Sequence, residues 1–365
     1  MVLGTWGSPS SSPLHNSFKI LAEIGLVQLM FLAGLEADWR ELKRMLKLSF
    51  SVGAWGFFFT AVSVAILTRL FVDRWAEALA MSAIVSASSF GISIYYFSEK
   101  KVLGSRVAVM VVGAAILSGL FAIAMMIASQ ATNYAVTYGA FKMTVAVSWF
   151  LAKLVMFFAI AYFLTSRFLK LSSKSGFQER PRQILIGYLL LVASLYAWAA
   201  IHFGSFAAVG VASLGGGLLG ASNPAVKEKI GKGFGSILAL IPVGILLMVI
   251  GMEVNLKAAE GSIIFLAVLL AVVIGAKLIG SRIATNKGYP SSPERVLIMF
   301  AVLAQGEIGI LIAAYLFSRG VLNPQSFSIA ILVAVGLTMV SPILMGIAST
   351  QLSKKELKGA PSFRH

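Results

Sequence analysis

The sequence predicts an all-α integral membrane protein with about eleven transmembrane helices, inverted-topology repeats and two broken helices. Composition is the first supporting observation: 58% of the 365 residues are hydrophobic and 12% are charged, whereas a soluble globular protein carries roughly 25% charged residues. The second is a series of apolar runs long enough to cross a bilayer. The third is a pattern that recurs in the two halves of the chain.

The apolar runs define the predicted helices, because about 20 apolar residues in a helix cross the hydrocarbon core of a membrane. We expect an extracytoplasmic N-terminal loop, a transmembrane domain and a short basic tail, at 1–17, 18–350 and 351–365. Within the domain, a first repeat (18–129), a linker helix (140–168) and a second repeat (183–349) follow one another. The predicted spans are 18–35, 46–71, 76–97, 105–129, 140–168, 183–203, 204–222, 232–252, 262–283, 294–318 and 326–349.

Basic residues predict the topology and explain the formal net charge of +16. They gather in the loops after the odd-numbered spans, for example Arg40, Lys43 and Arg44 after the first. Short loops rich in Lys and Arg face the cytoplasm, so we expect the N-terminus outside and the C-terminus in the cytoplasm. The charge therefore indicates a multi-pass protein of a cell membrane, either a bacterial inner membrane or its organellar equivalent, whose partner is the lipid bilayer and not nucleic acid.

Several chemistries have no support in the sequence. With 0 Cys and 3 His, disulfides and thiolate sites are excluded and no metal cluster is indicated. No catalytic constellation or phosphate-cradling glycine motif is found, and GGGLLG (215–220) lies within a predicted span, where helix packing explains it. We therefore expect no enzyme activity and no cofactor, and any transport is secondary, with only the transported ions bound.

An internal repeat links the two halves of the chain. GLEAD (34–38) and GMEVN (251–255) share a pattern at an offset of 217, and the same offset places the first four predicted spans on the last four. Seven spans separate the copies, and because this number is odd the copies have opposite orientations. Inverted repeats of this kind are typical of secondary transporters.

The same offset aligns two interruptions of apolar spans, SASSFG (86–91) and AQGEIG (304–309). Interrupted helices at matching places in two halves indicate a transport site at mid-membrane depth. Ordinary helix packing is the alternative, since small residues let helices approach and serine bonds back to its own helix. The candidate ion-site residues of these stretches are Ser86, Ser88, Ser89 and Gln305, and the broken-helix glycines are Gly91, Gly306 and Gly309.

Two charged residues are predicted to lie inside the membrane. Glu307 falls in the middle of the span 294–318, where a carboxylate marks a functional site by default; a protonated or ion-paired packing residue is the alternative. Lys277 lies five residues before Arg282, about 7.5 Å deeper along the helix. Its ammonium either serves the transport site or reaches the interface by snorkelling.

Three long stretches resemble the cation/proton antiporter superfamily, with its sodium/hydrogen exchanger-like transmembrane domain, and in particular the potassium/sodium-proton branch. They are FLAGLEADWRELKR, VKEKIGKGFGSILALIPVGILLMVIGMEVNL and AKLIGSRIATNKGYPSSPERVLIMFAVLAQGEIGILIAAYLFSRGVL. The resemblance implies an antiporter-like fold of thirteen helices, a six-helix core with two crossed broken helices, and a homodimer. It also implies exchange of Na⁺ or K⁺ for protons, with Lys277 as the basic partner and Glu307 as an acid of the second broken helix.

The chain departs from the family pattern in two ways. The first two helices are missing, which indicates either a naturally shortened member or a fragment of a longer gene. Where the family has paired acids, GAAILSGL (113–120) offers Ser118 and Gly119. Three hypotheses stay open: an antiporter that uses Glu307 as carrier, with Lys277 competing and Ser118 among the ligands; a transport-deficient accessory or assembly subunit with unknown partner subunits; or an anion-accepting variant.

Overall fold

The computed structural model describes residues 39–89, 91–100, 102, 105–139, 262–286 and 291–350, together with single residues between 141 and 163. All eight regular elements in these residues are α-helices. They belong to one compact unit, Arg40–Met143 with Asn255–His365. The predicted spans 18–35, 183–203, 204–222 and 232–252, and nearly all of 140–168, lie outside the described residues.

The first group of helices follows the predicted spans of the first repeat, with one broken helix in the middle. The predicted span 76–97 consists of two helices separated by residues 87–89, which we call the first break. This position agrees with the interruption predicted at SASSFG. The helices are α2 (Trp39–Phe71), α3 (Trp75–Ser86), α4 (Gly91–Glu99) and α5 (Arg106–Tyr138).

Helix α5 continues nine residues beyond the end predicted at position 129. Its last turns are more polar and more exposed than the rest, so hydropathy alone ends too early. The helix begins at Ser105, whose hydroxyl accepts a hydrogen bond from the Ala108 N–H at 3.2 Å. It ends at Gly139, which has a φ of +86° that favours glycine, and whose N–H bonds to the Ala135 carbonyl.

The second group repeats this arrangement. The predicted span 294–318 is broken at residues 302–306, the second break. The interruption was predicted at AQGEIG (304–309), but Glu307, Ile308 and Gly309 are already helical. A carboxylate in the first turn of a helix is favourable because the helix dipole is positive there, so Glu307 opens the helix instead of belonging to the break. The helices are α13 (Ile263–Asn286), α14 (Ser292–Ala301), α15 (Glu307–Ser318) and α16 (Pro324–Thr350).

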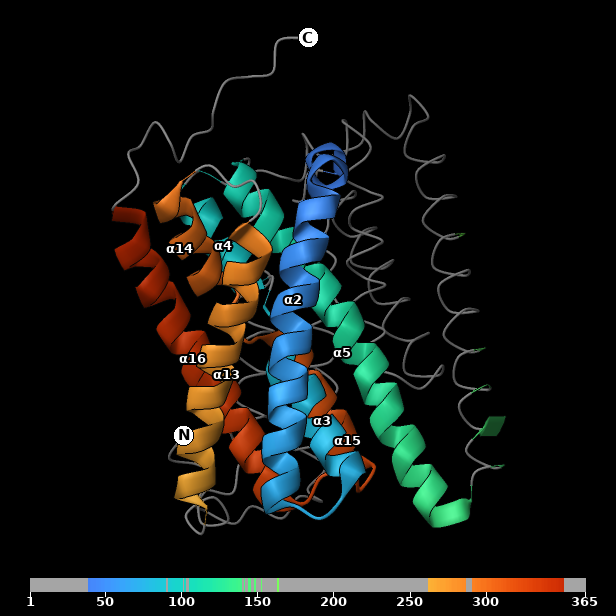
Figure 1. Ribbon diagram of the computed structural model, residues 1–365. Coiled ribbons are helices and arrows are strands. Elements are labelled where there is room, and N and C mark those ends of the chain that lie inside the picture. Colours follow the sequence, from blue (N-terminus) through green and yellow to red (C-terminus); the bar gives the residue numbers. More distant parts are fainter. Residues whose placement is uncertain are drawn as a thin grey trace, which may run out of the picture. The chain divides into compact units, whose positions relative to one another are not determined.

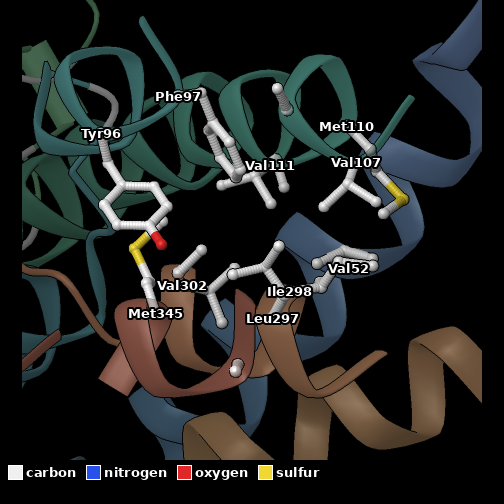
Figure 2. Packing of buried hydrophobic residues seen from close by; sticks show 14 of the residues in the cluster. Val52, Tyr96, Phe97, Val107, Met110, Val111, Leu297, Ile298, Val302 and Met345 are labelled. Carbon is white, nitrogen blue, oxygen red and sulfur yellow. The ribbon is translucent and has the colours of Figure 1, made fainter. Parts of the chain in front are cut away.

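The half-helices pair at opposite ends of the unit (Figure 1). Helix α3 packs against α15, and both contact α5 and α16. At the other end, residues of α4 and of the first turns of α5 form an apolar cluster with residues of α14, α16 and α2. Figure 2 shows Phe97 and Val111 on one side of this cluster and Ile298 and Val302 on the other. The two breaks therefore lie between two packed ends.

The described residues contain five helices that are long and apolar enough to cross a membrane. This number covers the described residues alone and does not confirm the count of eleven. Together with the family membership reported below, it establishes a multi-pass membrane protein. The spans are Lys47–Phe71, Trp75–Ser93, Arg106–Thr137, Ile263–Asn286 and Pro324–Thr350.

Candidate functional site: two crossing helix breaks

The two breaks contact each other through their backbones. The Ser89 N–H donates to the Ala304 carbonyl at 2.7 Å. The Ser88 hydroxyl donates to the Val302 carbonyl at 2.9 Å. Because 214 residues separate Ser88 from Val302, these bonds join the two repeats at their interruptions. We call this region the crossing.

Lys277 of α13 brings a positive charge into the crossing. Its side chain is 1% exposed, and its ammonium donates to the Ala87 carbonyl at 3.0 Å, the Ser88 hydroxyl at 3.2 Å and the Val302 carbonyl at 3.1 Å. A lysine ammonium has three N–H donors, so all three are used. The ammonium points to the breaks and does not snorkel. Oxygens of both breaks thus surround a monovalent cation that belongs to the protein.

Ser118 of α5 supports the first break. Its hydroxyl accepts a hydrogen bond from the Ser88 N–H at 3.1 Å and donates to the Ala115 carbonyl of its own helix at 2.8 Å. The hydroxyl therefore satisfies a buried backbone donor within the first break. Ser118 is therefore connected to Lys277 through Ser88.

Gln305 supports the second break and leaves one acceptor free. Its side-chain amide donates to the Val85 carbonyl, and its own carbonyl accepts from the Thr338 hydroxyl of α16. The Gln305 Oε1 and Ser86 Oγ atoms are buried and have no hydrogen-bond partner among the described residues. Buried oxygens without partners are costly, and both lie beside the C-terminal end of α3, where an ion or a water molecule would satisfy them.

The predicted residues occupy three kinds of position. Lys277, Ser88 and Ser118 form one bonded chain, while Ser89 and Gln305 tie the breaks together. Gly91 is the first residue of α4 and Gly306 is the N-cap of α15. Glu307 is the first residue of α15 and directly follows the second break; its side chain lies outside the described part of the chain.

Two glycines permit the close approach of α3 to the second break. At Gly306, an added Cβ would overlap the Ser89 side chain. At Gly309, an added Cβ would lie 2.5 Å from the Ile84 carbonyl oxygen, which is backbone and cannot rotate away. The glycines in AQGEIG are thus required for packing at the crossing and do not merely interrupt a helix.

We predict that Gly309→Ala lowers the free energy of unfolding by roughly 1–3 kcal/mol, as overpacked cores do. The matched control is Gly336→Ala on α16, where no atom lies within 4 Å of an added Cβ; we expect it to be neutral or to stabilise by up to about 1 kcal/mol. Thermal unfolding of the purified variants in detergent measures both. Equal midpoints for the two variants would contradict the close approach.

Sequence reasoning missed two groups that the crossing uses. The ligands Ala87 and Val302 act through carbonyl oxygens, which every residue carries, so no residue type marks them. Thr338 and Ser341 of α16 hold the Gln305 and Phe300 carbonyls. Their signal was present in the sequence, because both are hydroxyl residues in the interior of the predicted span 326–349.

No carboxylate stands at Ser118 or Gly119, and the space beside Gly119 is filled. A Cβ at Gly119 would lie 2.5 Å from Ile308 Cδ1 of α15. The packing of α5 on α15 therefore leaves no room for an acidic side chain at this position unless Ile308 moves. Among the described side chains, Lys277 brings the charge to the crossing.

Comparisons with known proteins agree with this architecture. The chain is 23% identical over 337 residues to the probable Na⁺/H⁺ antiporter GerT of Bacillus cereus, covering 90% of this chain and 86% of that protein. It is 23% identical over 331 residues to a Na⁺/H⁺ antiporter of Enterococcus hirae, covering 89% and 83%. The fold is similar to that of the sodium proton antiporter MjNhaP1 of Methanocaldococcus jannaschii, with a TM-score of 0.67, 16% identity, and coverage of 94% of this chain and 86% of that one.

The family assignment rests on nearly the whole chain. A sequence model of the sodium/hydrogen exchanger transmembrane family matches residues 1–347, which include both groups of described helices and both breaks. Members of this family are transporters and not enzymes. The chain belongs to the sodium/hydrogen exchanger transmembrane family.

Proposed function

We propose that the protein exchanges a monovalent cation, sodium in the first instance, for protons across the membrane. The observation that carries the proposal is the set of three oxygens around the Lys277 ammonium. Backbone carbonyl and hydroxyl oxygens replace the hydration shell of alkali cations, and these oxygens already surround a unit positive charge. Sodium is preferred to potassium because the relatives from Bacillus cereus and Enterococcus hirae are named Na⁺/H⁺ antiporters.

In the proposed mechanism, sodium and the Lys277 ammonium compete for the oxygens of Ala87, Ser88 and Val302. Both carry one positive charge, so the site holds one or the other. Glu307 adjoins the second break and carries the proton, since membrane-embedded carboxylates act as proton relays in transporters. Cation binding then favours the ionised carboxylate, and protonation favours release of the cation, which couples the two fluxes.

An anion-accepting variant is disfavoured by the bonding of Lys277. The ammonium spends its three donors on protein oxygens, and a lysine has no further donor. An anion would have to break at least one of these bonds to gain a contact with the charge. Most of the described polar groups at the crossing are carbonyl and hydroxyl oxygens, which attract cations.

A transport-deficient accessory subunit is the second candidate, and the filled space beside Gly119 favours it. If an acid next to Ser118 is indispensable for exchange, the chain lacks its charge, and the end of the Ile308 side chain occupies the space beside Gly119. The chain would then keep the transporter fold and lose the reaction. This candidate predicts no exchange from well-folded protein.

The double variant Gly119→Asp with Ile308→Ala distinguishes the two candidates. We expect Gly119→Asp alone to destabilise the protein, because its Cβ meets Ile308 Cδ1 at 2.5 Å, and Ile308→Ala to relieve the overlap. If the protein is an active exchanger, the wild type already exchanges ions, and the double variant only changes the cation affinity. Exchange that appears only in the double variant would support the accessory subunit instead.

The proposed function is tested by proton flux in proteoliposomes that hold the purified 365-residue chain. A trapped pH-sensitive dye reports the response to added sodium, potassium or lithium, and protein-free vesicles are the control. A sodium-dependent change of internal pH supports exchange. No response to any of the cations, from protein that unfolds cooperatively on heating, would overturn it and favour the accessory role.

A further inference from the structure

A carboxylate is buried in the unit, away from both breaks. Glu77 lies in the first turn of α3 and is 1% exposed. Within the described residues its hydrogen bond comes from the Asn323 N–H, at 3.3 Å. Asn323 in turn caps α16, since its side-chain oxygen accepts from the Ser326 N–H at 2.7 Å. A carboxylate buried in a membrane helix without a cationic partner is expensive and by default marks a function.

No basic side chain of the described residues pairs with Glu77. At the start of α3, the Arg74 guanidinium bonds to Asn133 at 2.7 Å. Just before this helix, Asp73 pairs with Arg69 of α2. On α15, Arg319 stacks over Tyr315. The other titratable or charged groups of the elements packed against α3 are Arg106, Tyr134 and Tyr138 on α5, Glu307 on α15, and Lys277 and Arg282 on α13, while α16 carries none over Pro324–Thr350.

Helix α3 connects Glu77 directly to the crossing. The helix ends at Ser86, and the carbonyls at its C-terminal end, those of Val85 and Ala87, accept from Gln305 and Lys277. Ten of its twelve residues are buried, so little water separates the two ends. At the helical rise, Glu77 lies about 15 Å from these carbonyls.

We propose that Glu77 is a positioning residue for the cation: its negative charge, acting along α3, stabilises the positive charge at the crossing. At an effective dielectric constant of about 20, a unit charge about 15 Å away changes the affinity for a monovalent cation by up to roughly sixfold, with the full factor when the displaced Lys277 ammonium moves away from the crossing. Glu77 thus supplies, at a distance, part of the charge that Ser118 and Gly119 do not carry. The proposal rests on the proposed exchange function.

The repeat provides a matched control. Adding the offset of 217 to position 77 gives Glu294, which lies in the first turn of α14. Glu294 begins the second broken helix as Glu77 begins the first, but it is only half-buried. Charges in contact with water are strongly screened, so neutralising Glu294 should change cation affinity by less than about twofold.

The experiment measures the apparent KM for sodium and the maximal exchange rate in proteoliposomes for wild type, Glu77→Gln, Glu77→Asp and Glu294→Gln. We expect Glu77→Gln to raise the KM by up to roughly sixfold with little change in maximal rate. Glu77→Asp keeps the charge and should restore most of the affinity.

The outcomes separate this proposal from the proposed function. An unchanged sodium KM in Glu77→Gln, or a Glu77→Asp variant as impaired as Glu77→Gln, overturns the electrostatic role while wild-type exchange stands. If the wild type shows no exchange, the readout becomes the rise of the unfolding temperature with added sodium. A smaller rise in Glu77→Gln than in wild type still supports the role of Glu77, and an equal rise, or none in either protein, overturns it.

Discussion

Lys277→Met is expected to destabilise the protein and to increase its response to sodium. In the absence of sodium the variant leaves the Ala87 and Val302 carbonyls and the Ser88 hydroxyl without the ammonium that bonds to them. Removing one member of a buried charged network costs on the order of 3 kcal/mol. Added sodium then meets no competitor, so it should raise the unfolding temperature of the variant more than that of the wild type.

The measurement is thermal unfolding in detergent at several sodium concentrations, with choline replacing sodium to keep the ionic strength constant. Arg282→Met is the matched control, because it removes a basic residue from the same helix at an exposed position. A Lys277→Met variant as stable as wild type, with the same sodium response, would contradict the competition at the crossing. A loss of stability without a larger sodium response would leave Lys277 as a purely structural residue.

The sequence predicted the helices best where apolar residues fill a span from end to end. Helices α13 and α16 differ from the predicted spans by three residues or fewer at each end. The start of α2 and the end of α5 were missed by seven and nine residues. Hydropathy follows the apolar part of a helix, whereas the helix itself ends at a cap such as Gly139.

The candidate site could be predicted as far as side-chain types reveal it. Lys277, Ser88 and Gln305 were accessible because polar residues are conspicuous in apolar spans. The carbonyl ligands of Ala87 and Val302 were not, since a helix break exposes carbonyls of any residue type and its position must be known to within one residue. Ile308 was missed for another reason: its contact with Gly119 joins two helices whose packing register the sequence does not specify.

Glu77 illustrates a signal that was present and not used. The offset of 217 that aligned the two interruptions also aligns Glu77 with Glu294. Both residues begin a broken helix, but a glutamate in a first helical turn is ordinarily a favourable response to the helix dipole. Glu77 differs from Glu294 in being buried against the N-terminus of α16, and burial depends on tertiary packing.

Glu307→Gln is expected to abolish pH-dependent exchange while leaving the fold intact. Glutamine has nearly the same size and retains the helix start at the second break, but it cannot release or bind a proton at transport pH. We expect exchange to fall to the rate of protein-free vesicles, a loss of at least about tenfold, since general acid–base groups contribute roughly 10²–10⁴-fold to proton-transfer steps. The measurement is dye-reported proton flux after a sodium step, and Glu99→Gln at the exposed end of α4 is the control.

The two variants together assign the carrier. Binding and exchange are separable, because sodium needs the oxygens of the crossing, whereas coupling needs a group that gains and loses a proton. If Glu307→Gln still gains stability from sodium but no longer moves protons, binding is intact and Glu307 is the carrier. Normal exchange by Glu307→Gln would show that Glu307 is not the carrier. The carrier would then be Lys277, a titratable group that bonds to both breaks, and it would release its proton when sodium takes its oxygens.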